Sequence, residues 1–261
     1  MKQGIFTIGS NRPLTANVRE MVLTGDTAAC QRPGQFVNLK LEGCFLRRPI
    51  SVCDYEDGQI KLIYKIVGKG TQAMAAMEPG KQLDVLTGLG NGYDISKAGS
   101  DPVLIGGGAG IPPLYGLFRE LNRRRAESAA ANTDGKQQSS AKAAPIRVIL
   151  GFGTADEIFY QKEFEKAGAE VLLATADGSA GRKGFVTDVL AELDYSYFYT
   201  CGPEAMFRAI EKIAKTSGQY SFEERMGCGF GACMGCTCRT KYGSKRICKE
   251  GPVLEREEIL W

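Results

Sequence analysis

Four cysteines near the end of the sequence have the type and spacing for iron chemistry. Cys228, Cys233, Cys236 and Cys248 form a C-x4-C-x2-C pattern, with eleven residues before the fourth cysteine. Four thiolates at such a spacing hold a 2Fe–2S cluster. Glycines at positions 227, 229, 231 and 235 allow the loop to wrap closely and turn its N–H groups toward sulfur. Because such a cluster transfers one electron at a time, we expect other electron carriers on the same chain.

Structural zinc is the main alternative for these cysteines, and a disulfide framework is a second. Zinc sites usually combine two C-x-x-C or H-x-x-H pairs, but the only C-x-x-C here is Cys233–Cys236. The chain has no histidine, which excludes Cys/His zinc sites and a Rieske cluster. We interpret Cys238 as a small packed side chain on a strand that leaves the loop.

Composition narrows the class of protein. The 261 residues are 43% hydrophobic and 24% charged with a net charge of +3, which is ordinary for a globular protein and gives no nucleic-acid signal. No apolar run is long enough for a bilayer, so we expect no membrane association. Residues 1–7 lack the apolar core of a signal peptide, and nine cysteines suit a reducing compartment, so we expect a cytoplasmic protein.

The absence of histidine also affects catalysis. Histidine is the commonest general acid or base near neutral pH. The sequence is therefore poorly equipped for proton-transfer chemistry, and we expect it to have no catalytic side chain of its own.

Residues 1–97 predict an antiparallel β-barrel. Short runs of β-forming residues are separated by turns such as Pro33-Gly34 and Asp57-Gly58. Many short strands at this spacing are typical of a small barrel. One helix is predicted over residues 71–78, capped by Thr71 and ended by Pro79-Gly80.

Residues 98–220 predict a Rossmann-like α/β domain. Apolar strands at 102–105, 146–151, 171–174 and 195–200 alternate with helical stretches at 114–125, 157–166, 185–192 and 204–216. Such alternation indicates a parallel sheet. Residues 126–144 are polar and alanine-rich without periodicity, so we predict a mobile insertion. Residues 221–261 would form a small cluster module, in which Trp261 is either a packing anchor or part of a partner surface.

Two segments of the α/β domain could bind a dinucleotide. The loop from Gly106 to Pro113 follows a strand and opens a helix, so Gly106, Gly107, Gly108 and Gly110 would let N–H groups approach a pyrophosphate; a plain tight turn is the alternative. Cys201, Gly202 and Pro203 follow the fourth strand, where ligands bind in open α/β sheets. Cys201 would lie beside a nicotinamide or be a buried thiol.

The predicted barrel has phosphate-type segments of its own. Arg47 and Arg48 precede Pro49-Ile50-Ser51, and an arginine fork suits a diphosphate while a serine hydroxyl reaches a polar ring edge. Two solvated arginines are the alternative. The segment from Val67 to Thr71 contains two glycines before a predicted helix, which is a second anion site. Two such sites, one per domain, argue for two nucleotide-like ligands.

Together these motifs resemble the ferredoxin–NADP reductase superfamily. Arg-Pro-Ile-Ser and Gly-Lys-Gly-Thr lie in the first domain, and Gly-Gly-Gly-x-Gly-Ile-Pro-Pro-Leu and Cys-Gly-Pro lie in the second. The ending from Glu223 to Cys236 closely resembles electron-transfer subunits of dihydroorotate dehydrogenase B. This chain has Ala109 where relatives have isoleucine, and Thr87-Gly-Leu-Gly-Asn-Gly-Tyr93 where they tend to have Gly-Pro-Leu-Gly-Asn-Gly-Phe.

The resemblance implies three cofactor sites. FAD would be held by Arg48, Pro49, Ile50, Ser51, Lys65, Ile66, Val67, Gly70 and Thr71. NAD⁺ would bind the α/β domain at its glycine loop and Cys201–Pro203 segment, and the four cysteines would ligate the 2Fe–2S cluster. Asp156 and Glu157 follow the second strand of that domain, where carboxylates would repel the 2′-phosphate of NADP; solvated surface charge is the alternative.

The resemblance also implies a partner. It would be an FMN-containing catalytic subunit that oxidises dihydroorotate in pyrimidine synthesis, in a heterotetramer with two copies of each subunit. One alternative is a flavin and iron–sulfur reductase subunit of another complex, such as a ferredoxin:NADP⁺ transhydrogenase or a hydrogenase. An alternative of a different class is a non-catalytic, zinc-stabilised binding module.

Overall fold

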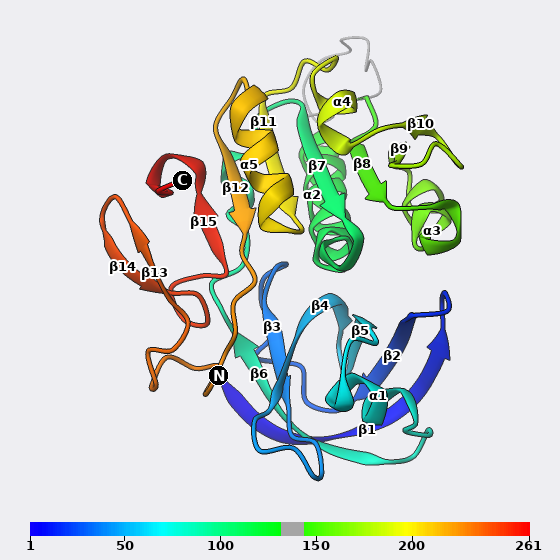
Figure 1. Cartoon of the computed structure of the whole chain (residues 1–261), viewed down its shortest axis with the longest axis vertical. Coiled ribbons are helices and arrows are strands. Elements are labelled where there is room, and N and C mark those ends of the chain that lie inside the picture. The colour runs from blue at the N-terminus through cyan, green and yellow to red at the C-terminus, as the bar shows by residue number, and fades with distance from the viewer. Residues whose placement is uncertain (132–143) are drawn as a thin grey trace.

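The computed structural model describes residues 1–131 and 144–261. Two bodies, a barrel and a helix-covered sheet, dominate the structure, and the C-terminal segment lies along one side of both (Figure 1). Among the described residues, no helix combines the length and the hydrophobicity that crossing a bilayer requires. Most of the predicted insertion, residues 132–143, lies outside the described residues.

The first six strands close into an antiparallel barrel in the order β1-β2-β5-β4-β3-β6, as predicted. Their bounds are β1 Lys2–Pro13, β2 Val18–Thr24, β3 Phe36–Leu39, β4 Arg48–Glu56, β5 Gln59–Lys65 and β6 Gln82–Leu89. Alternate residues such as Phe6 and Ile8, or Met21 and Leu23, point into the barrel core. Strand β6 was not predicted, although exposed Gln82 and half-buried Asp84 alternate with buried Leu83 and Val85 at its start.

Helix α1, Lys69–Ala75, begins earlier than predicted. Gly68 is its N-cap, and Thr71 lies in the first turn. The Thr71 hydroxyl accepts hydrogen bonds from the N–H groups of Val67 (2.9 Å) and Gly68 (3.2 Å). The prediction that Thr71 caps the helix is therefore wrong. Thr71 instead holds the loop that leads into the helix.

The second body is a seven-stranded sheet in the order β10-β9-β8-β7-β11-β12-β15, parallel except for β15. Its strands are β7 Pro102–Gly107, β8 Arg147–Phe152, β9 Glu170–Thr175, β10 Arg182–Lys183, β11 Tyr197–Cys201, β12 Gly218–Ser221 and β15 Val253–Glu255. Its helices are α2 Pro112–Ala131, α3 Gln161–Lys166, α4 Val186–Leu190 and α5 Glu204–Ile213. The predicted parallel sheet is confirmed.

Each face of the sheet packs against its own pair of helices, because neighbouring residues of a strand point to opposite faces. Leu104 packs in one core with residues of α2 and α3. Val103 and Ile105 pack in the other with residues of α4 and α5. Helix α2 continues six residues past the predicted end at Arg125, so residues 126–131 are helical rather than part of an insertion.

The C-terminal segment is attached to the sheet. After the hairpin of β13 Thr237–Thr240 and β14 Gly243–Arg246, strand β15 pairs antiparallel with β12. Trp261 packs edge-on against Tyr220, with ring centroids 5.1 Å apart. Of the two interpretations of Trp261, the packing anchor therefore has direct structural support.

Candidate functional site: two cavities and a cysteine loop

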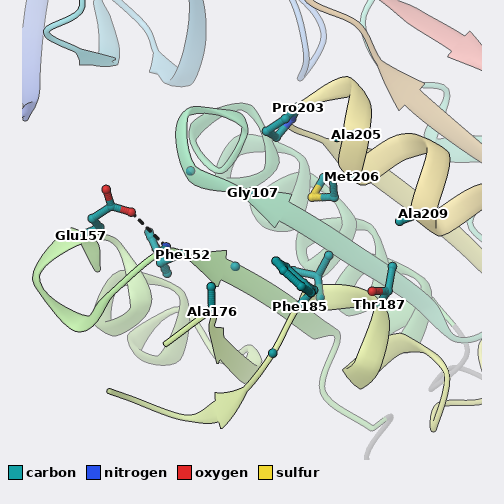
Figure 2. A pocket seen from close by; sticks show the side chains of 15 residues that line it. Gly107, Phe152, Glu157, Ala176, Phe185, Thr187, Pro203, Ala205, Met206 and Ala209 are labelled. Atoms are coloured by element: carbon teal, nitrogen blue, oxygen red, sulfur yellow. Dashed lines mark hydrogen bonds between the residues drawn. The ribbon is translucent and has the colours of Figure 1, made fainter. Parts of the chain in front are cut away.

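A cavity of about 510 Å³ lies at the carboxyl ends of β7, β8 and β9, which we call the strand-end cavity (Figure 2). Ligands of open α/β sheets bind at this edge. Its lining comes from the ends of these strands, the entry to α4 and the first turns of α5: Gly107, Gly108, Gly151, Phe152, Gly153, Glu157, Ala176, Gly184, Phe185, Val186, Thr187, Pro203, Ala205, Met206 and Ala209. Only Gly107, Gly108, Glu157 and Pro203 among these were predicted site residues.

Among the residues that the structure describes, no arginine or lysine lines the strand-end cavity, and Glu157 is the one charged residue there. Its Oε2 accepts a hydrogen bond from the Gly153 N–H at 3.0 Å (Figure 2). Asp156 lines a smaller neighbouring cavity instead. The strand-end cavity therefore offers backbone N–H groups and apolar walls but no arginine or lysine for an additional phosphate.

The glycine loop packs directly against the end of β11. A Cβ built at Gly110 would lie 2.2 Å from the carbonyl oxygen of Cys201, so only glycine fits there. A Cβ at Gly106 would likewise clash with the Ile111 side chain. Gly106 and Gly110 thus shape the loop, whereas Gly107 and Gly108 face the cavity.

A second cavity, of about 380 Å³, lies between the barrel edge and the sheet, and we call it the barrel-edge cavity. Its predicted lining residues are Arg48, Pro49, Ile50, Ser51, Lys65, Val67, Thr71 and Cys201. Ile66 does not line it and packs against the barrel core. Gly70 does not line it either, but its backbone approaches Arg48 so closely that a Cβ would lie 2.3 Å from Nε.

The remaining lining of the barrel-edge cavity was not predicted. It consists of Phe36, Ile63, Tyr64, Ala109, Ser221, Phe222, Glu223, Glu224, Met226 and Pro252. Desolvation raises the pKa of the Glu223 carboxyl. Residues 221–226 lead straight into Cys228, so one wall of this cavity is the start of the cysteine loop.

Cys201 is a wall residue of the barrel-edge cavity and is only 2% exposed. Burial raises the pKa of its thiol, which therefore stays protonated. Of the two interpretations, the buried thiol is therefore confirmed, and this thiol also borders the barrel-edge cavity.

Several contacts join the bodies that carry the cavities, and two of them involve residues near the cavities or deep in the interface. Lys65, at the end of β5, lies 3.9 Å from the carboxylate of Glu157, and both side chains are about half exposed. Deeper in the interface, Glu20 accepts hydrogen bonds from Tyr160 Oη at 2.7 Å and Arg12 Nε at 2.8 Å. Burial, Cys53 and Glu20 raise the pKa of the Tyr160 hydroxyl, which keeps it a donor.

The four cysteines of the loop form two pairs. The Cys228 N–H donates to Cys233 Sγ, and the Cys233 N–H donates back to Cys228 Sγ, both at 3.4 Å. In the second pair, the Cys248 N–H donates to Cys236 Sγ at 3.4 Å. The first pair faces outward, with Cys233 exposed, whereas Cys236 and Cys248 are buried. Two pairs of thiols fit the two irons of a 2Fe–2S cluster better than a single metal ion.

Other observations agree with that fit. All nine cysteines are free, against the disulfide alternative. Although desolvation opposes it, hydrogen bonds from backbone N–H groups lower the pKa of Cys228 to about 6, which favours the thiolate that binds iron. Cys238 packs beside the sheet core, as interpreted from the sequence.

Comparison with family models matches two parts of the chain. Residues 223–260 match the iron–sulfur cluster binding domain of dihydroorotate dehydrogenase B. Residues 104–212 match the oxidoreductase NAD-binding domain. The first match begins at Glu223, a wall of the barrel-edge cavity, and includes all four cysteines.

Relatives match over the whole length. The chain is 38% identical to the dihydroorotate dehydrogenase B (NAD(+)) electron transfer subunit of Geobacillus sp. strain WCH70, across 100% of this chain and 99% of the relative. It is 37% identical to the subunit of that name from Fusobacterium nucleatum subsp. nucleatum, across 99% of both.

Solved structures share the fold. A chain of NADH-dependent reduced ferredoxin-NADP oxidoreductase superposes with a TM-score of 0.83 and 27% identity, across 99% of this chain and 90% of that one. A ferredoxin NADP⁺ reductase from Neisseria gonorrhoeae with bound FAD and NADP superposes with a TM-score of 0.66 and 14% identity, across 85% and 100%. The second likeness shows the fold alone.

Proposed function

The chain belongs to the family of dihydroorotate dehydrogenase B electron transfer subunits, and from this membership we propose that it passes electrons from a dihydroorotate-oxidising subunit to NAD⁺ in pyrimidine synthesis. When bound, the 2Fe–2S cluster supplies one-electron transfer, and FAD supplies the conversion between single electrons and a hydride. The protein's part is to bind these groups, hold them close together and keep water out.

One observation carries this proposal. The barrel-edge cavity is bounded on one side by Arg48–Ser51 and on another by Phe222–Met226, which lead into Cys228. A flavin in this cavity would therefore lie beside the cysteine loop. Cys201 also lines this cavity, and its carbonyl packs against Gly110 of the glycine loop, which supports a site for the flavin beside the NAD⁺ site.

The family resemblance and this arrangement together support the residue roles that we propose. We assign FAD binding to Arg48, Pro49, Ile50, Ser51, Lys65, Ile66, Val67, Gly70 and Thr71, with Ile66 and Gly70 acting from behind the cavity wall. We assign NAD⁺ binding to Gly106, Gly107, Gly108, Gly110, Cys201, Gly202 and Pro203. We assign the cluster to Cys228, Cys233, Cys236 and Cys248. No side chain is assigned a catalytic proton transfer.

The division into units and the setting belong to the same proposal. Residues 1–97 would be the FAD-binding barrel, 98–220 the NAD-binding unit and 221–261 the cluster module, the last sharing the sheet through β15. The partner would carry FMN and assemble as two copies of each subunit, which is supported by the family resemblance. A cytoplasmic location is supported by the nine free cysteines.

The test is reconstitution. The purified protein, loaded with FAD and cluster, is mixed with the FMN-containing catalytic subunit from the same cell, dihydroorotate and NAD⁺. We expect NADH to form only when both subunits are present. No NADH from a mixture in which both proteins retain their visible cofactor spectra would contradict the proposal.

One observation favours a second candidate, a ferredoxin-linked transhydrogenase subunit. The NADH-dependent reduced ferredoxin-NADP oxidoreductase has a similar fold over nearly the whole chain. The same reconstitution with reduced ferredoxin and NADP⁺ in place of dihydroorotate and NAD⁺ distinguishes the two. The cation-free strand-end cavity makes us expect little NADP⁺ reduction.

A further inference from the structure

One buried amide beside the cysteine loop is left incompletely paired. Asn38 lies on β3 and is only 1% exposed. Its Nδ2 donates a hydrogen bond to the carbonyl oxygen of Cys228 at 3.1 Å. Among the residues that the structure describes, its Oδ1 is the only buried side-chain nitrogen or oxygen atom without a hydrogen-bond partner. Because an unpaired buried acceptor destabilises a fold, stability alone does not explain an asparagine at this position.

Strand β3 has one face toward the barrel core and the other toward the cysteines. Val37 and Leu39 pack in the barrel core, so Phe36 and Asn38 point to the opposite side. Phe36 lines the barrel-edge cavity and belongs to the same apolar core as Cys236. The same short strand therefore borders both the proposed flavin site and the cysteine loop.

The backbone of Asn38 is tied to the segment that we assign to FAD. Asn38 lies opposite Pro49 in the antiparallel pairing of β3 with β4. Its carbonyl oxygen accepts a hydrogen bond from Arg47 Nη1 at 3.3 Å. Asn38 therefore connects the Arg48–Ser51 segment with Cys228, which is 190 residues further along the chain.

The cysteine loop fits closely against this amide. Gly229 has a φ of 78°, and a Cβ there would lie 2.3 Å from Asn38 Nδ2, so only glycine fits. Cys228 exchanges two hydrogen bonds with Cys233, and its Sγ also accepts one from the Ala232 N–H at 3.2 Å. A shift of the Cys228 backbone would therefore displace both sulfur atoms of the outer pair.

The cluster module does not depend on Asn38 for its attachment. The Asn91 side chain donates to the carbonyl oxygens of Glu250 at 3.0 Å and Val253 at 2.7 Å, and it accepts from the Val253 N–H at 3.1 Å. Strand β15 adds its pairing with β12. The end of the module is thus held by a fully paired amide, whereas Asn38 acts at the outer cysteine pair.

We propose that Asn38 is a positioning residue for the cluster, which holds Cys228 in place against the barrel and thereby sets the reduction potential of the cluster and its electron exchange with the flavin. Hydrogen bonds and burial around the sulfur atoms determine the potential of an iron–sulfur cluster. The positive end of the amide dipole lies beside Cys228, so it favours the more negative, reduced cluster. The inference rests on the proposed function, because it assumes that a flavin and a cluster exchange electrons on this chain.

Asn38→Leu tests this role, because leucine has nearly the same size but neither donates nor accepts a hydrogen bond. The full chain, loaded with FAD and cluster, is titrated with reductant at controlled potential while the electron paramagnetic resonance signal of the reduced cluster is recorded. We expect the midpoint potential to move to lower values and the signal to change shape. A chelator should remove the cluster roughly ten- to a hundredfold faster than from wild type.

Rapid mixing with NADH gives a second measurement. Two electrons from NADH reduce the flavin, and one of them then passes to the cluster, so the two absorbance changes can be followed separately. In Asn38→Leu the flavin should be reduced at the wild-type rate, whereas the cluster should be reduced at least about tenfold more slowly.

A second variant and a matched control accompany Asn38→Leu. Asn38→Asp keeps the shape of the side chain but replaces the donor with a carboxyl group, and it should shift the potential in the same direction. Asn122→Leu removes an amide–carbonyl bond of the same length, 3.1 Å, from Asn122 on α2 to Ala167 after α3. This control should keep the wild-type potential, signal and rate of cluster loss.

The outcomes separate this inference from the proposed function. If both Asn38 variants keep the wild-type potential, signal and rate of cluster reduction, Asn38 is a packing residue only and the inference is wrong, even if the variants unfold more easily. If NADH does not reduce the flavin of the wild-type protein, or if the reduced wild-type protein has no paramagnetic signal, the proposed function itself is contradicted.

Discussion

The strand-end cavity and the barrel-edge cavity are of similar size, but they differ in which parts of the molecule form their walls. The first, about 510 Å³, is lined only by residues of the sheet body, at the ends of its strands and helices. The second, about 380 Å³, combines the barrel edge, the end of β11 and the segment before the cysteines. Within residues 1–131 and 144–261, no cation lines the first cavity, whereas Arg48 and Lys65 line the second.

This difference matches the two ligands that we assign. A substrate that exchanges on every turnover suits a cavity of backbone N–H groups and apolar walls, where no single contact dominates. A cofactor that stays bound suits a cavity closed by several segments and anchored by a guanidinium. The comparison therefore predicts one strong anchor in the barrel-edge cavity and mainly shape-dependent binding in the strand-end cavity.

The largest effect is expected from Arg48→Ala. Loss of a charged hydrogen-bond donor costs roughly 1.5–3 kcal/mol, so FAD should bind about ten- to a hundredfold more weakly. The measurement is the flavin-to-protein ratio after gel filtration, with a titration of free FAD. The control is Arg182→Ala, which removes an exposed arginine that pairs with Glu192 and lines neither cavity. Full retention of flavin by Arg48→Ala would show that Arg48 does not anchor FAD.

Filling the strand-end cavity should affect only the nucleotide. Ala209→Phe adds a ring from α5 into the space seen in Figure 2. Because the ring would occupy space that the nucleotide needs, the KM for NAD⁺ should rise by roughly tenfold while the flavin content stays unchanged. Steady-state kinetics with Ala209→Ser as the matched small substitution provides the check. A loss of flavin from Ala209→Phe would show that the two cavities are not independent.

The contact between the two bodies is tested by Tyr160→Phe. The change leaves the buried Glu20 carboxylate with Arg12 but without the tyrosine hydroxyl. An unsatisfied buried acceptor costs about 1–3 kcal/mol, so the free energy of unfolding should fall by that order. We also expect kcat for NAD⁺ reduction to fall more than KM rises, because the nicotinamide and flavin positions lose a shared restraint. Tyr242→Phe, at an exposed tyrosine, is the control.

The same comparison shows what could be predicted from the sequence. The glycine loop and the Arg48–Ser51 segment were found because each is a short local pattern next to a strand. The Phe222–Met226 wall and the Glu20–Tyr160 contact join residues far apart in the chain. A local sequence pattern does not indicate such long-range contacts. Glu223 offered a signal only through its place before the cysteines, since a lone glutamate is usually a solvated charge.

Strand assignments failed for a related reason. Strand β15 is three residues long and joins the sheet antiparallel at its edge, after a chain excursion through the cysteine loop. A run this short has no readable alternation, and its pairing depends on a hydrogen-bonding edge that only the folded sheet provides. The start of α1 was misplaced because Thr71 acts from inside the first turn, where its hydroxyl resembles a cap in sequence.

The smallest effect is expected in the barrel, outside both cavities. The Arg47 guanidinium, followed by Gln3, lowers the pKa of Asp84 despite some desolvation. Because the folded pKa is depressed, this carboxylate stabilises the fold at pH above its unfolded value near 3.8, and the contribution is lost as pH falls through the folded value. Asp84→Asn should therefore cost about 1 kcal/mol or less near neutral pH.

The cost should disappear in acid, where wild type is protonated as well. Urea unfolding of both proteins at several pH values measures this, and flavin content should stay equal because neither Arg47 nor Asp84 lines a cavity. A deficit that persisted unchanged to low pH would mean that Asp84 acts through shape rather than charge. A loss of flavin would mean that Arg47, once released from Asp84, no longer holds Arg48 in place, and the single-anchor description of the barrel-edge cavity would have to include both arginines.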